Sequence, residues 1–569
     1  MPRPDADLGA AQRGRRLLRF YLVKPSQYDA DGTVWRFRWG VVPNNTLTVL
    51  AGLAADWAAR RAEVDLQTVL WEELLDGVVS PVVIASLRER AAADGATLLV
   101  GVAGVQTGQY ARARDLALQC RVAGVAVACG GFHITSHAPS RDFLAAHGVT
   151  VVIGEAETTL AALLDDHLSG QLQAEYRVGG GLRARTGLGT ITVPDIATAP
   201  LPALDARYLR RFFNPTLSTV DTARGCPFAC SYCAVKNVMG RTVRGRDPAR
   251  VVDWVRQAYD AHGVRSLFLV DDDLYRSPHW EALFTGLAAL RSAGRDLSFM
   301  MQADVEASLC SDATPRAARS RRFVDLAAAA GCYAVFVGFE SFDPRNLALT
   351  LKVQNQAHAD RRAGSGLDED APARVLARYR QAVATWHAAG VAVHAGYMVG
   401  LPHDGRGAGA AAARALLDIG VDLASFFPYT PLPGTEDYDA ALARGDMRSD
   451  DFNDWDCLHV VNRHPTLTRA EVYREYCDAH RTFYGWRRLA WSLLSGYRVA
   501  GLSPAARWGM LTQQVYYTYA YRRGWHPMMG GLWRVRDHTV RRQAVSDAQA
   551  AAVAFGATCA LSRAAAPDR

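Results

Sequence analysis

The strongest constraint on the fold of this 569-residue chain is a repeated alternation of short apolar stretches with longer helix-forming stretches. The alternation occurs in two blocks, residues 17–170 and residues 217–433. It is typical of parallel sheets whose strands are joined by helices. The sequence therefore predicts an α/β protein with two successive parallel sheets.

The first block predicts an open, doubly wound (Rossmann-like) sheet. Ligands bind such sheets at the carboxyl ends of the strands. Two expected strand ends carry a turn that suits a ligand: Gly130-Gly131, with His133 close behind, and Gly154 with Glu155 and Glu157. Paired glycines let backbone approach a bulky group closely, although such turns are also common in loops that bind no ligand. The expected strands are Leu17–Val23, Val64–Trp71, Leu98–Val105, Val125–Cys129 and Val149–Ile153.

The second block predicts a partial (β/α)6 TIM-type barrel. Barrels of this type place their functional residues on the loops that follow the strands. Polar and turn-forming residues gather at those positions, among them Asp272, Gln302, Glu340, Gly400 and Pro433. The expected strands are Leu217–Asp221, Ser266–Val270, Leu297–Gln302, Ala334–Phe339, Ala392–Val399 and Leu423–Phe427.

These strand ends also have structural interpretations, which remain open at this stage. Asp271, Asp272 and Asp273 are three successive acids that could cap the next helix. Glu340 could belong to a structural ion pair. The polar stretch from Leu351 to Arg374 is expected to be either a loop over the barrel mouth or a tolerated insertion.

Cys226, Cys230 and Cys233 follow the first strand of the second block with the spacing C-x3-C-x2-C. Three thiolates on one short loop suit an iron–sulfur cluster, and a self-contained four-iron cluster needs four cysteines. The open fourth iron is then free to bind a small chelating molecule. A zinc knuckle is the alternative, but zinc needs a fourth Cys or His nearby, and none follows before His262.

The cysteine trio, with Tyr232 before its last member, resembles the signature of the radical S-adenosylmethionine (SAM) enzymes. The resemblance implies a [4Fe-4S] cluster on the three cysteines and SAM chelated to the open iron. Cleavage of SAM by this cluster gives a 5′-deoxyadenosyl radical. The SAM-contacting residues that the resemblance implies are Tyr232, Asp272, Gln302, Glu340, Gly400 and Pro433.

The two glycine turns, placed before such a motif, resemble the cobalamin-binding domain of the B12-dependent branch of that family. Many cobalamin proteins place a histidine below cobalt through Asp-x-His-x-x-Gly, and the corresponding loop here contains Gln106 and Thr107 instead. The resemblance therefore implies cobalamin without a histidine on cobalt. For His133 it implies a contact with the cobalamin tail, whereas a histidine that bonds only its own turn is the structural alternative. The implied cobalamin contacts are Gln106, Thr107, Gly130, Gly131, His133, Gly154, Glu155 and Glu157.

Charge and composition divide the chain further. Residues 481–542 hold eleven arginines against the single acid Asp537, with interleaved tryptophans and tyrosines. This pattern suits a solvated helical cap, a membrane-surface segment or, last, a nucleic-acid surface, for which no binding module is apparent. Scattered cysteines and the absence of a signal peptide or long apolar run favour the cytoplasm. The expected division is a basic tail (1–16), a cobalamin-binding domain (17–172), a linker (173–212), a radical SAM partial barrel (213–440) and a mostly helical C-terminal region (441–569).

The leading hypothesis is a cobalamin-dependent radical SAM methyltransferase that methylates an unactivated carbon of a small molecule, natural-product or lipid-like. The alternative is a cyclase or ring-rearranging oxidoreductase with the same cofactors and no net methyl transfer. The expected partners are a small-molecule substrate and an electron donor such as flavodoxin or ferredoxin. Peripheral membrane contact through residues 481–542 is a further hypothesis, and no nucleic acid is expected.

Overall fold

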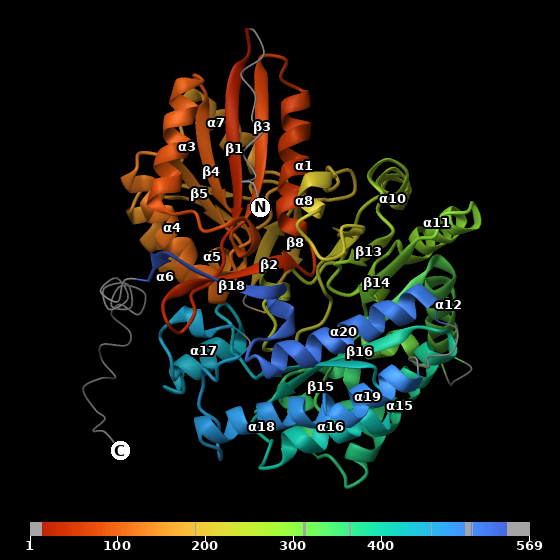
Figure 1. The fold of residues 1–569 in the computed structure, drawn as a ribbon. Coiled ribbons are helices and arrows are strands. Elements are labelled where there is room, and N and C mark those ends of the chain that lie inside the picture. Colours follow the sequence, from red (N-terminus) through yellow and green to blue (C-terminus); the bar gives the residue numbers. More distant parts are fainter. Residues whose placement is uncertain are drawn as a thin grey trace, which may run out of the picture.

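The computed structural model describes residues 14–187, 189–310, 314–363, 366–456, 458–495, 502 and 504–542. Two six-stranded parallel sheets dominate it (Figure 1). The basic tail up to residue 13 and the alanine-rich end beyond residue 542 lie outside the described residues.

The first sheet, red and orange in Figure 1, has the strand order β3-β1-β4-β5-β6-β7. All five strands predicted in the first block are confirmed. A sixth strand, β7, lies in the segment predicted as a linker. Helices cover both faces of the sheet. Leu18, Phe20 and Leu22 of β1 pack into the core on one face, and Tyr21 and Val23 pack into the core on the other face. The strands are β1 (Arg16–Lys24), β3 (Val64–Glu72), β4 (Thr97–Val102), β5 (Ala126–Gly130), β6 (Thr150–Ile153) and β7 (Glu175–Arg177).

Helices α1 (Asn45–Ala59) and α7 (Leu160–Ser169) pack on one face of this sheet. Helices α3 (Pro81–Ala93), α4 (Tyr110–Val122) and α6 (Ala138–Ala146) pack on the other. Side-chain caps fix where several of them begin: the Asn44 side chain accepts from the Leu47 amide, and the Ser80 hydroxyl from the Val83 amide.

The second sheet has the strand order β10-β13-β14-β15-β16-β17, which follows the chain order strand by strand. All six strands predicted in the second block are confirmed. The strands are β10 (Leu217–Val220), β13 (Ser266–Leu269), β14 (Ser298–Gln302), β15 (Cys332–Glu340), β16 (Ala392–Val399) and β17 (Leu423–Pro428). The helices joining them are α10 (Pro248–His262), α11 (Trp280–Ser292), α12 (Pro315–Ala330), α15 (Ala371–Ala388) and α16 (Ala408–Asp418).

The two faces of the second sheet differ in burial. Val335, Val337 and Phe339 of β15 pack into the core with Tyr379 and Trp386 of α15. On the opposite face, β10 and β16 are also buried, but several residues of the other strands are only partly buried. They include Phe268, Met300, Phe336, Gly338 and Phe427. The inner face of the sheet is therefore lined in part by accessible, mostly apolar side chains.

The described part of the C-terminal region contains several helices and then a strand, which was not predicted from the sequence. Helices α17 (Glu436–Ala443), α18 (Arg469–Phe483), α19 (Trp486–Ser495) and α20 (Pro504–Arg522) precede β18 (Gly531–Arg541). Strand β18 pairs antiparallel with β2 (Thr33–Gly40), an excursion after β1. Figure 1 shows β18 reaching back beside β2 at the base of the first sheet.

The segment 173–212, predicted as a linker, is structured. Besides β7, it contains the hairpin β8 (Leu182–Arg185) and β9 (Thr190–Val193) and the short helix α8 (Ala206–Leu209). Tyr208 and Phe212 are buried and join the main core, so this segment fastens the two sheets to each other.

Candidate functional site

The three signature cysteines lie on the loop that follows β10, after the short strand β11 (Ala223–Arg224). Gly225 opens the loop with φ +90°, and a Cβ there would lie 2.5 Å from the Thr242 carbonyl oxygen, so the turn requires glycine. The Cys226 amide donates to the Gly240 carbonyl at 3.3 Å, and the Cys233 amide to the Cys230 carbonyl at 3.2 Å. The backbone thus holds all three cysteines, which are free thiols, on one curved segment.

The thiols are close enough to influence one another electrostatically. Burial, followed by nearby negative charge, raises the pKa of Cys226, and the Cys230 and Cys233 thiols contribute to the rise. Burial, followed by the charge of Cys230, raises the pKa of Cys233 to about 12. Thiolates at these positions therefore need a strongly positive group, as a metal cluster provides. In the described ranges no group of three or more His, Cys, Asp or Glu side chains is arranged to hold a single metal ion.

Polar side chains surround this loop. The Lys352 ammonium donates to Glu340 Oε1 at 2.9 Å, and the Tyr232 hydroxyl is hydrogen-bonded to the same carboxylate. Burial, then the charge of Glu340, raises the pKa of Tyr232. Glu340 has φ 63°, a left-handed backbone conformation that is strained for a residue with a side chain. Strain of this kind often marks a functional position, and it points the carboxylate of Glu340 at the cysteine loop.

The segment after β15 closes over the cysteine loop. The Ser231 amide donates to the Thr350 carbonyl at 3.1 Å, and Gln354 Nε2 lies 3.8 Å from Cys230 Sγ. Within the described structure, the buried atoms Ser231 Oγ, Gln354 Oε1 and Asn355 Oδ1 have no hydrogen-bond partner. Unpaired buried polar atoms are rare in proteins. Their concentration beside three thiols fits a polar ligand bound to a cluster there.

Of the three consecutive acids after β13, the first two hold the segment that leads into the cysteine loop, and the third, Asp273, accepts from the Asp304 amide at 3.3 Å. Asp271 accepts from the Thr222 amide and hydroxyl, both at 2.5 Å, and from the Ala223 amide at 2.8 Å. Asp272 Oδ2 accepts from the Gly225 amide at 2.9 Å. The short helix that follows, Leu274–Arg276, receives no side-chain cap from Asp273.

Three further predicted SAM contacts lie at the ends of β14, β16 and β17. Gln302 ends β14 and is half-buried. The Gly400 amide donates to Asp404 Oδ2 at 2.8 Å, and a Cβ on Gly400 would lie 2.5 Å from Val472, so this glycine is needed for packing against α18. Pro433 is buried in the loop after β17. The adjacent Gly434 carbonyl accepts from Asn237 Nδ2, which links that loop to the cysteine loop.

A cavity of about 360 Å³ lies at the carboxyl end of the first sheet, facing the second sheet. Its walls are mostly apolar. Among the polar atoms of lining residues, Asn45 Oδ1 and Thr159 Oγ1 have neither a hydrogen-bond partner nor an ion-pair partner in the described structure. Apolar walls that contain several glycines and a few unsatisfied polar atoms fit a bulky ligand that carries polar groups. The glycines that line it are Gly101, Gly104, Gly130, Gly131 and Gly154.

The predicted cobalamin contacts divide into two groups. Gly130, Gly131, Gly154, Glu155 and Glu157 line the cavity. Gln106, Thr107 and His133 lie behind it, outside the lining that the described residues form.

His133 is only 1% exposed, with Nε2 2.9 Å from the Ser140 hydroxyl and Nδ1 3.4 Å from the Thr107 hydroxyl. Its ring packs on Tyr110 and Phe452, and burial, then the charge of His137, lowers its pKa. This is the geometry expected of a structural histidine.

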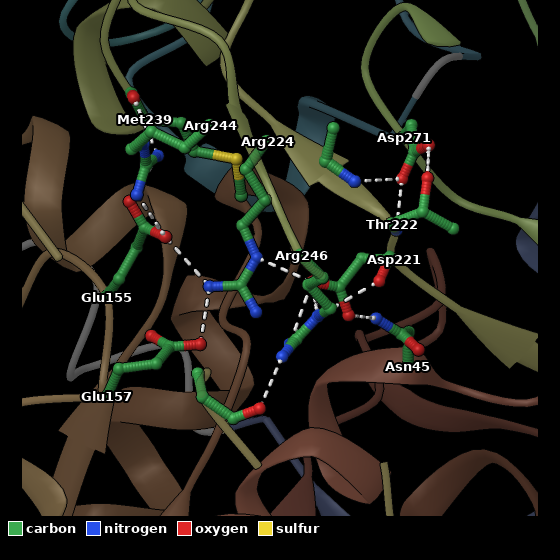
Figure 2. Close-up of polar contacts among 12 residues, drawn as sticks. Asn45, Glu155, Glu157, Asp221, Thr222, Arg224, Met239, Arg244, Arg246 and Asp271 are labelled. Atoms are coloured by element: carbon green, nitrogen blue, oxygen red, sulfur yellow. Dashed lines mark hydrogen bonds and ion pairs between the residues drawn. The ribbon is translucent and has the colours of Figure 1, made fainter. Parts of the chain in front are cut away.

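A buried ion-pair network joins the cavity to the cysteine loop (Figure 2). Arg224, two residues before Cys226, lies 2.7 Å from Glu155 and 2.6 Å from Glu157, both after β6, and 2.9 Å from Asp221. Arg244 also pairs with Glu155, at 2.8 Å.

On the other side of the network, Arg246 pairs with Asp221 at 3.0 Å, and Asn45 Nδ2 donates to Asp221 Oδ1 at 3.0 Å. Burial acts to raise the pKa of Asp221, but the charges of Arg224 and Arg246 outweigh it and hold that pKa below its ordinary value. The resulting set of three carboxylates and three guanidinium groups is internally balanced, as buried charges must be.

Glu155 and Glu157 were predicted as ligand contacts from the sequence, but Arg224 and Arg244, which pair with them, were not. Asp221 and Lys352 were not predicted either, because charged residues are common at strand ends. The one available signal was the arginine two residues before the first cysteine.

The comparisons agree with this geometry. Residues 220–407 match the sequence model of the Radical SAM superfamily. The bacteriochlorophyllide d C-12(1)-methyltransferase of Chlorobaculum tepidum is 23% identical over 64% of this chain and 70% of its own length. The anaerobic magnesium-protoporphyrin IX monomethyl ester cyclase of Cereibacter sphaeroides is 24% identical over 59% of this chain and 51% of its own.

Two solved structures share the fold. The radical SAM methyltransferase TsrM from Kitasatospora setae, solved with cobalamin and a [4Fe-4S] cluster, superposes with a TM-score of 0.52 at 18% identity, covering 76% of this chain and 78% of its own. The cobalamin-dependent radical SAM enzyme OxsB superposes with a TM-score of 0.53 at 14% identity, covering 89% of this chain and 72% of its own. The chain therefore carries a radical SAM domain at residues 220–407 and has the fold of the cobalamin-dependent radical SAM enzymes.

Proposed function

We propose that this protein is a cobalamin-dependent radical SAM methyltransferase that methylates an unactivated carbon of a small molecule. The observation that carries the proposal is the direct connection, through Arg224, between the cavity of the first sheet and the three-cysteine loop of the second. Two reactive cofactors can act on one substrate only when the protein holds both at one place.

In this assignment residues 17–172 form a Rossmann-like cobalamin-binding domain, and residues 213–440 form a partial (β/α)6 barrel that binds the cluster and SAM. Segment 173–212 joins them. Its strand β7 extends the first sheet, and Tyr208 donates a hydrogen bond to Glu72 at 2.9 Å. Residues 441–569 form the C-terminal region.

Cys226, Cys230 and Cys233 would hold the [4Fe-4S] cluster. Glu340, fixed by Lys352 and Tyr232, faces the position of SAM, and a carboxylate there suits an ammonium or hydroxyl group. Asp272 lines the cavity and also bonds the Gly225 amide, so it lies between the two cofactor sites. Gln302, Gly400 and Pro433 complete the proposed SAM site from neighbouring strand ends.

The cavity would hold the nucleotide tail of cobalamin between β4, β5 and β6. Gly130, Gly131 and Gly154 leave room for it, and Glu155 and Glu157 form its floor together with Arg224. Gln106 and Thr107 occupy the loop where other cobalamin proteins carry the cobalt-binding histidine. His133 contributes by holding that loop through Thr107, not by contacting the ligand.

When bound, the cofactors supply one-electron cleavage of SAM and a methyl group that can be transferred to carbon. The protein's own residues position the cofactors and the substrate and limit the access of solvent. Lys352 and Gln354 cover one side of the cysteine loop, while the apolar side chains of the inner face, including Phe268, Met300 and Phe336, form the wall facing the substrate. Such a wall favours a largely apolar or polycyclic substrate over a small polar one.

A second candidate function keeps the cofactors and changes the outcome to ring formation without net methyl transfer. The cyclase similarity over 59% of this chain favours it. The two functions differ in product mass, because only methyl transfer adds a methyl group.

The test is anaerobic reconstitution of the full chain with iron, sulfide, SAM and cobalamin, followed by incubation with candidate metabolites and mass spectrometry. Methyl transfer from CD3-labelled SAM would give a product that carries the label. A product that gains no label and loses hydrogen would identify the cyclase instead. Failure to cleave SAM at all would reject both.

A further inference from the structure

The structure points to a docking surface for an acidic one-electron carrier protein, directly outside the cysteine loop; we propose that such a carrier reduces the cluster from this side. The inference rests on the proposed function, because only a cluster that cleaves SAM needs a reductant. One electron passes from the carrier to the iron–sulfur cluster, and no bond forms or breaks.

The first observation is an alternation of inward and outward side chains after β15. Lys352 and Gln354 are buried and face the cysteine loop, as their contacts with Glu340 and Cys230 show. Leu349, Leu351 and Val353 on the same segment are 52, 45 and 37% exposed. These three side chains form an apolar patch. The backbone of this one segment separates the patch from the cysteine loop.

The backbone of Leu351 is strained, and packing within the folded protein does not explain this strain. Its backbone has φ 54°, a conformation in which Asn, Asp or Gly is expected and a branched apolar side chain is strained. An apolar residue that is exposed and also strained gains nothing from the folded core. A partner protein that covers it accounts for both properties.

The second observation is a group of arginines beside the apolar patch. Arg276 stacks on Phe228 of the cysteine loop at 4.9 Å, and pairs with Glu306 at 2.6 Å. Arg316 and Arg361 also pair with Glu306.

Arg378 completes the group. It donates to the Gln354 carbonyl at 3.1 Å, and its buried Nε has no hydrogen-bond partner in the described structure.

Positive charge exceeds negative charge in this group. Arg276, Arg316, Arg361 and Arg378 outnumber the three carboxylates that pair with members of this group, which are Asp273, Asp304 and Glu306. Burial, then the charge of Arg361, lowers the pKa of Arg378 to about 10. Burial, then Arg276, lowers that of Arg361. The arginines therefore repel one another, and an anionic partner would relieve that repulsion.

An apolar centre with a cationic rim fits a partner whose redox centre is surrounded by acidic residues. Such interfaces are small and transient, and their charges mainly accelerate encounter. Cys226, Pro227, Phe228 and Ala229 of the cysteine loop are themselves partly exposed, so the loop reaches the protein surface.

The test measures binding of purified flavodoxin, and separately ferredoxin, to the full-length protein by isothermal titration calorimetry. The double variant Leu351→Asp/Val353→Asp adds two carboxylates to the apolar patch, and Asp suits the backbone of residue 351. Arg316→Gln removes one cation from the rim. We expect each variant to raise Kd at least about tenfold, and the Kd of the wild-type protein to rise between about 0.1 and 1 M salt as the Debye length shortens from about 10 to about 3 Å.

Matched controls lie elsewhere on the surface. Val122→Asp/Leu182→Asp adds the same charges at two exposed apolar residues, and Arg322→Gln removes an exposed arginine on the same helix, α12, that pairs with Glu281. The controls should leave Kd within about twofold of the wild-type value. The docking surface is wrong if neither carrier binds at low salt, or if the controls weaken binding as much as the patch variants do.

A second readout separates this proposal from the proposed function. Cluster reduction is followed by electron paramagnetic resonance without substrate, with either the reduced carrier or dithionite as the reductant. The patch variants should be reduced slowly by the carrier and normally by dithionite. If product analysis shows no methyl transfer while this pattern holds, the docking surface stands and the methyltransferase assignment falls; equal rates with the carrier reject the surface alone.

Discussion

Cys230 is the most enclosed of the three loop thiols, at 6% exposure, and its sulfur lies beside the Gln354 amide. We predict that Cys230→Ala abolishes the iron–sulfur absorbance of the reconstituted protein together with SAM cleavage, since a cluster held by two thiolates is not retained. Cys477→Ala, at a half-buried cysteine on α18, should preserve both. A full cluster in Cys230→Ala would contradict the ligand assignment.

His526 provides a prediction about pH. It is fully buried against the Phe426 carbonyl, and burial lowers its pKa from 6.5 to about 4. Below pH 6.5 the unfolded chain therefore binds a proton that the folded chain does not, so stability falls as pH drops from 6.5 towards 4. At pH 5 this single group should cost about 2 kcal/mol relative to neutral pH.

The measurement is urea unfolding of wild-type and His526→Asn proteins at pH 7 and pH 5. Asn can still accept from the Met528 amide, as His526 Nδ1 does at 3.2 Å, but it does not titrate. The variant should be less stable at pH 7 and lose less stability on acidification. An identical pH dependence in the two proteins would show that His526 is not buried in its neutral form.

At the residue scale, sequence reasoning found positions better than it found partners. It placed Glu155 and Glu157 at a ligand site, and the structure puts both on the cavity wall. It considered Asp271 to Asp273 as helix caps, whereas Asp271 and Asp272 hold the segment that leads into the cysteine loop. Long-range partners such as Arg224 with Glu155 depend on how two sheets meet, and local patterns carry no information about that.

Strand β18 gives a prediction at the scale of an element. Gly531 begins this strand, and a Cβ there would lie 2.0 Å from the ring of Phe37 on β2. Phe37 is fully buried against Trp35 and Trp525 and cannot move aside. Gly531→Ala should therefore lower the free energy of unfolding by about 1–3 kcal/mol, the usual cost of overpacking.

Gly509→Ala is the control for this substitution. Gly509 lies inside helix α20 with nothing within 4 Å of the added methyl group, so alanine should stabilise the helix by up to about 1 kcal/mol. Thermal unfolding of the two variants should thus shift in opposite directions from the wild-type midpoint. A shift in the same direction would mean that β18 does not pack on β2 as described.

The parallel strands could be predicted because each is a short apolar run between helices. Strands β2 and β18 could not, because each alternates apolar residues with arginines, as in Trp-Arg-Phe-Arg-Trp at residues 35–39 and Trp-Arg-Val-Arg-Asp at residues 533–537. Strand β18 is largely accessible and β2 mostly buried, and each forms its backbone hydrogen bonds with a partner that is distant in the sequence. Antiparallel pairs of this kind leave no signal of their partner in the local sequence.

At the scale of the whole molecule, Arg224 connects the two sheets. We predict that Arg224→Ala destabilises the protein by about 3–5 kcal/mol, because it leaves the Glu155, Glu157 and Asp221 carboxylates with too few partners in a buried site. Arg207→Ala, which removes an exposed arginine near Asp205, should cost less than about 1 kcal/mol. Denaturant unfolding measures both. Equal effects would mean that the network is open to water.

The basic C-terminal region also belongs to this scale. No helix of the described residues is long and apolar enough to cross a membrane. Trp486, Trp508 and Leu494 are nevertheless 63, 67 and 88% exposed among the arginines. We propose that this face contacts anionic lipid, and we predict co-sedimentation with anionic vesicles at low salt that disappears at high salt, where charges are screened. Indifference to vesicles at every ionic strength would leave the region a solvated cap.

The pairing of β2 with β18 can form only late in synthesis, because the two strands are far apart in the sequence. Arg36 and its partner Asp537 are 501 residues apart, so at about 5–20 residues per second a ribosome takes roughly 25–100 s to supply the second after the first. Throughout that interval β2 lacks the strand that pairs with it, and Trp35 and Phe37 have no Trp525 to cover them. The amino-terminal half therefore leaves the ribosome with an aromatic edge uncovered, and we expect this edge to be a binding site for a holdase chaperone during synthesis.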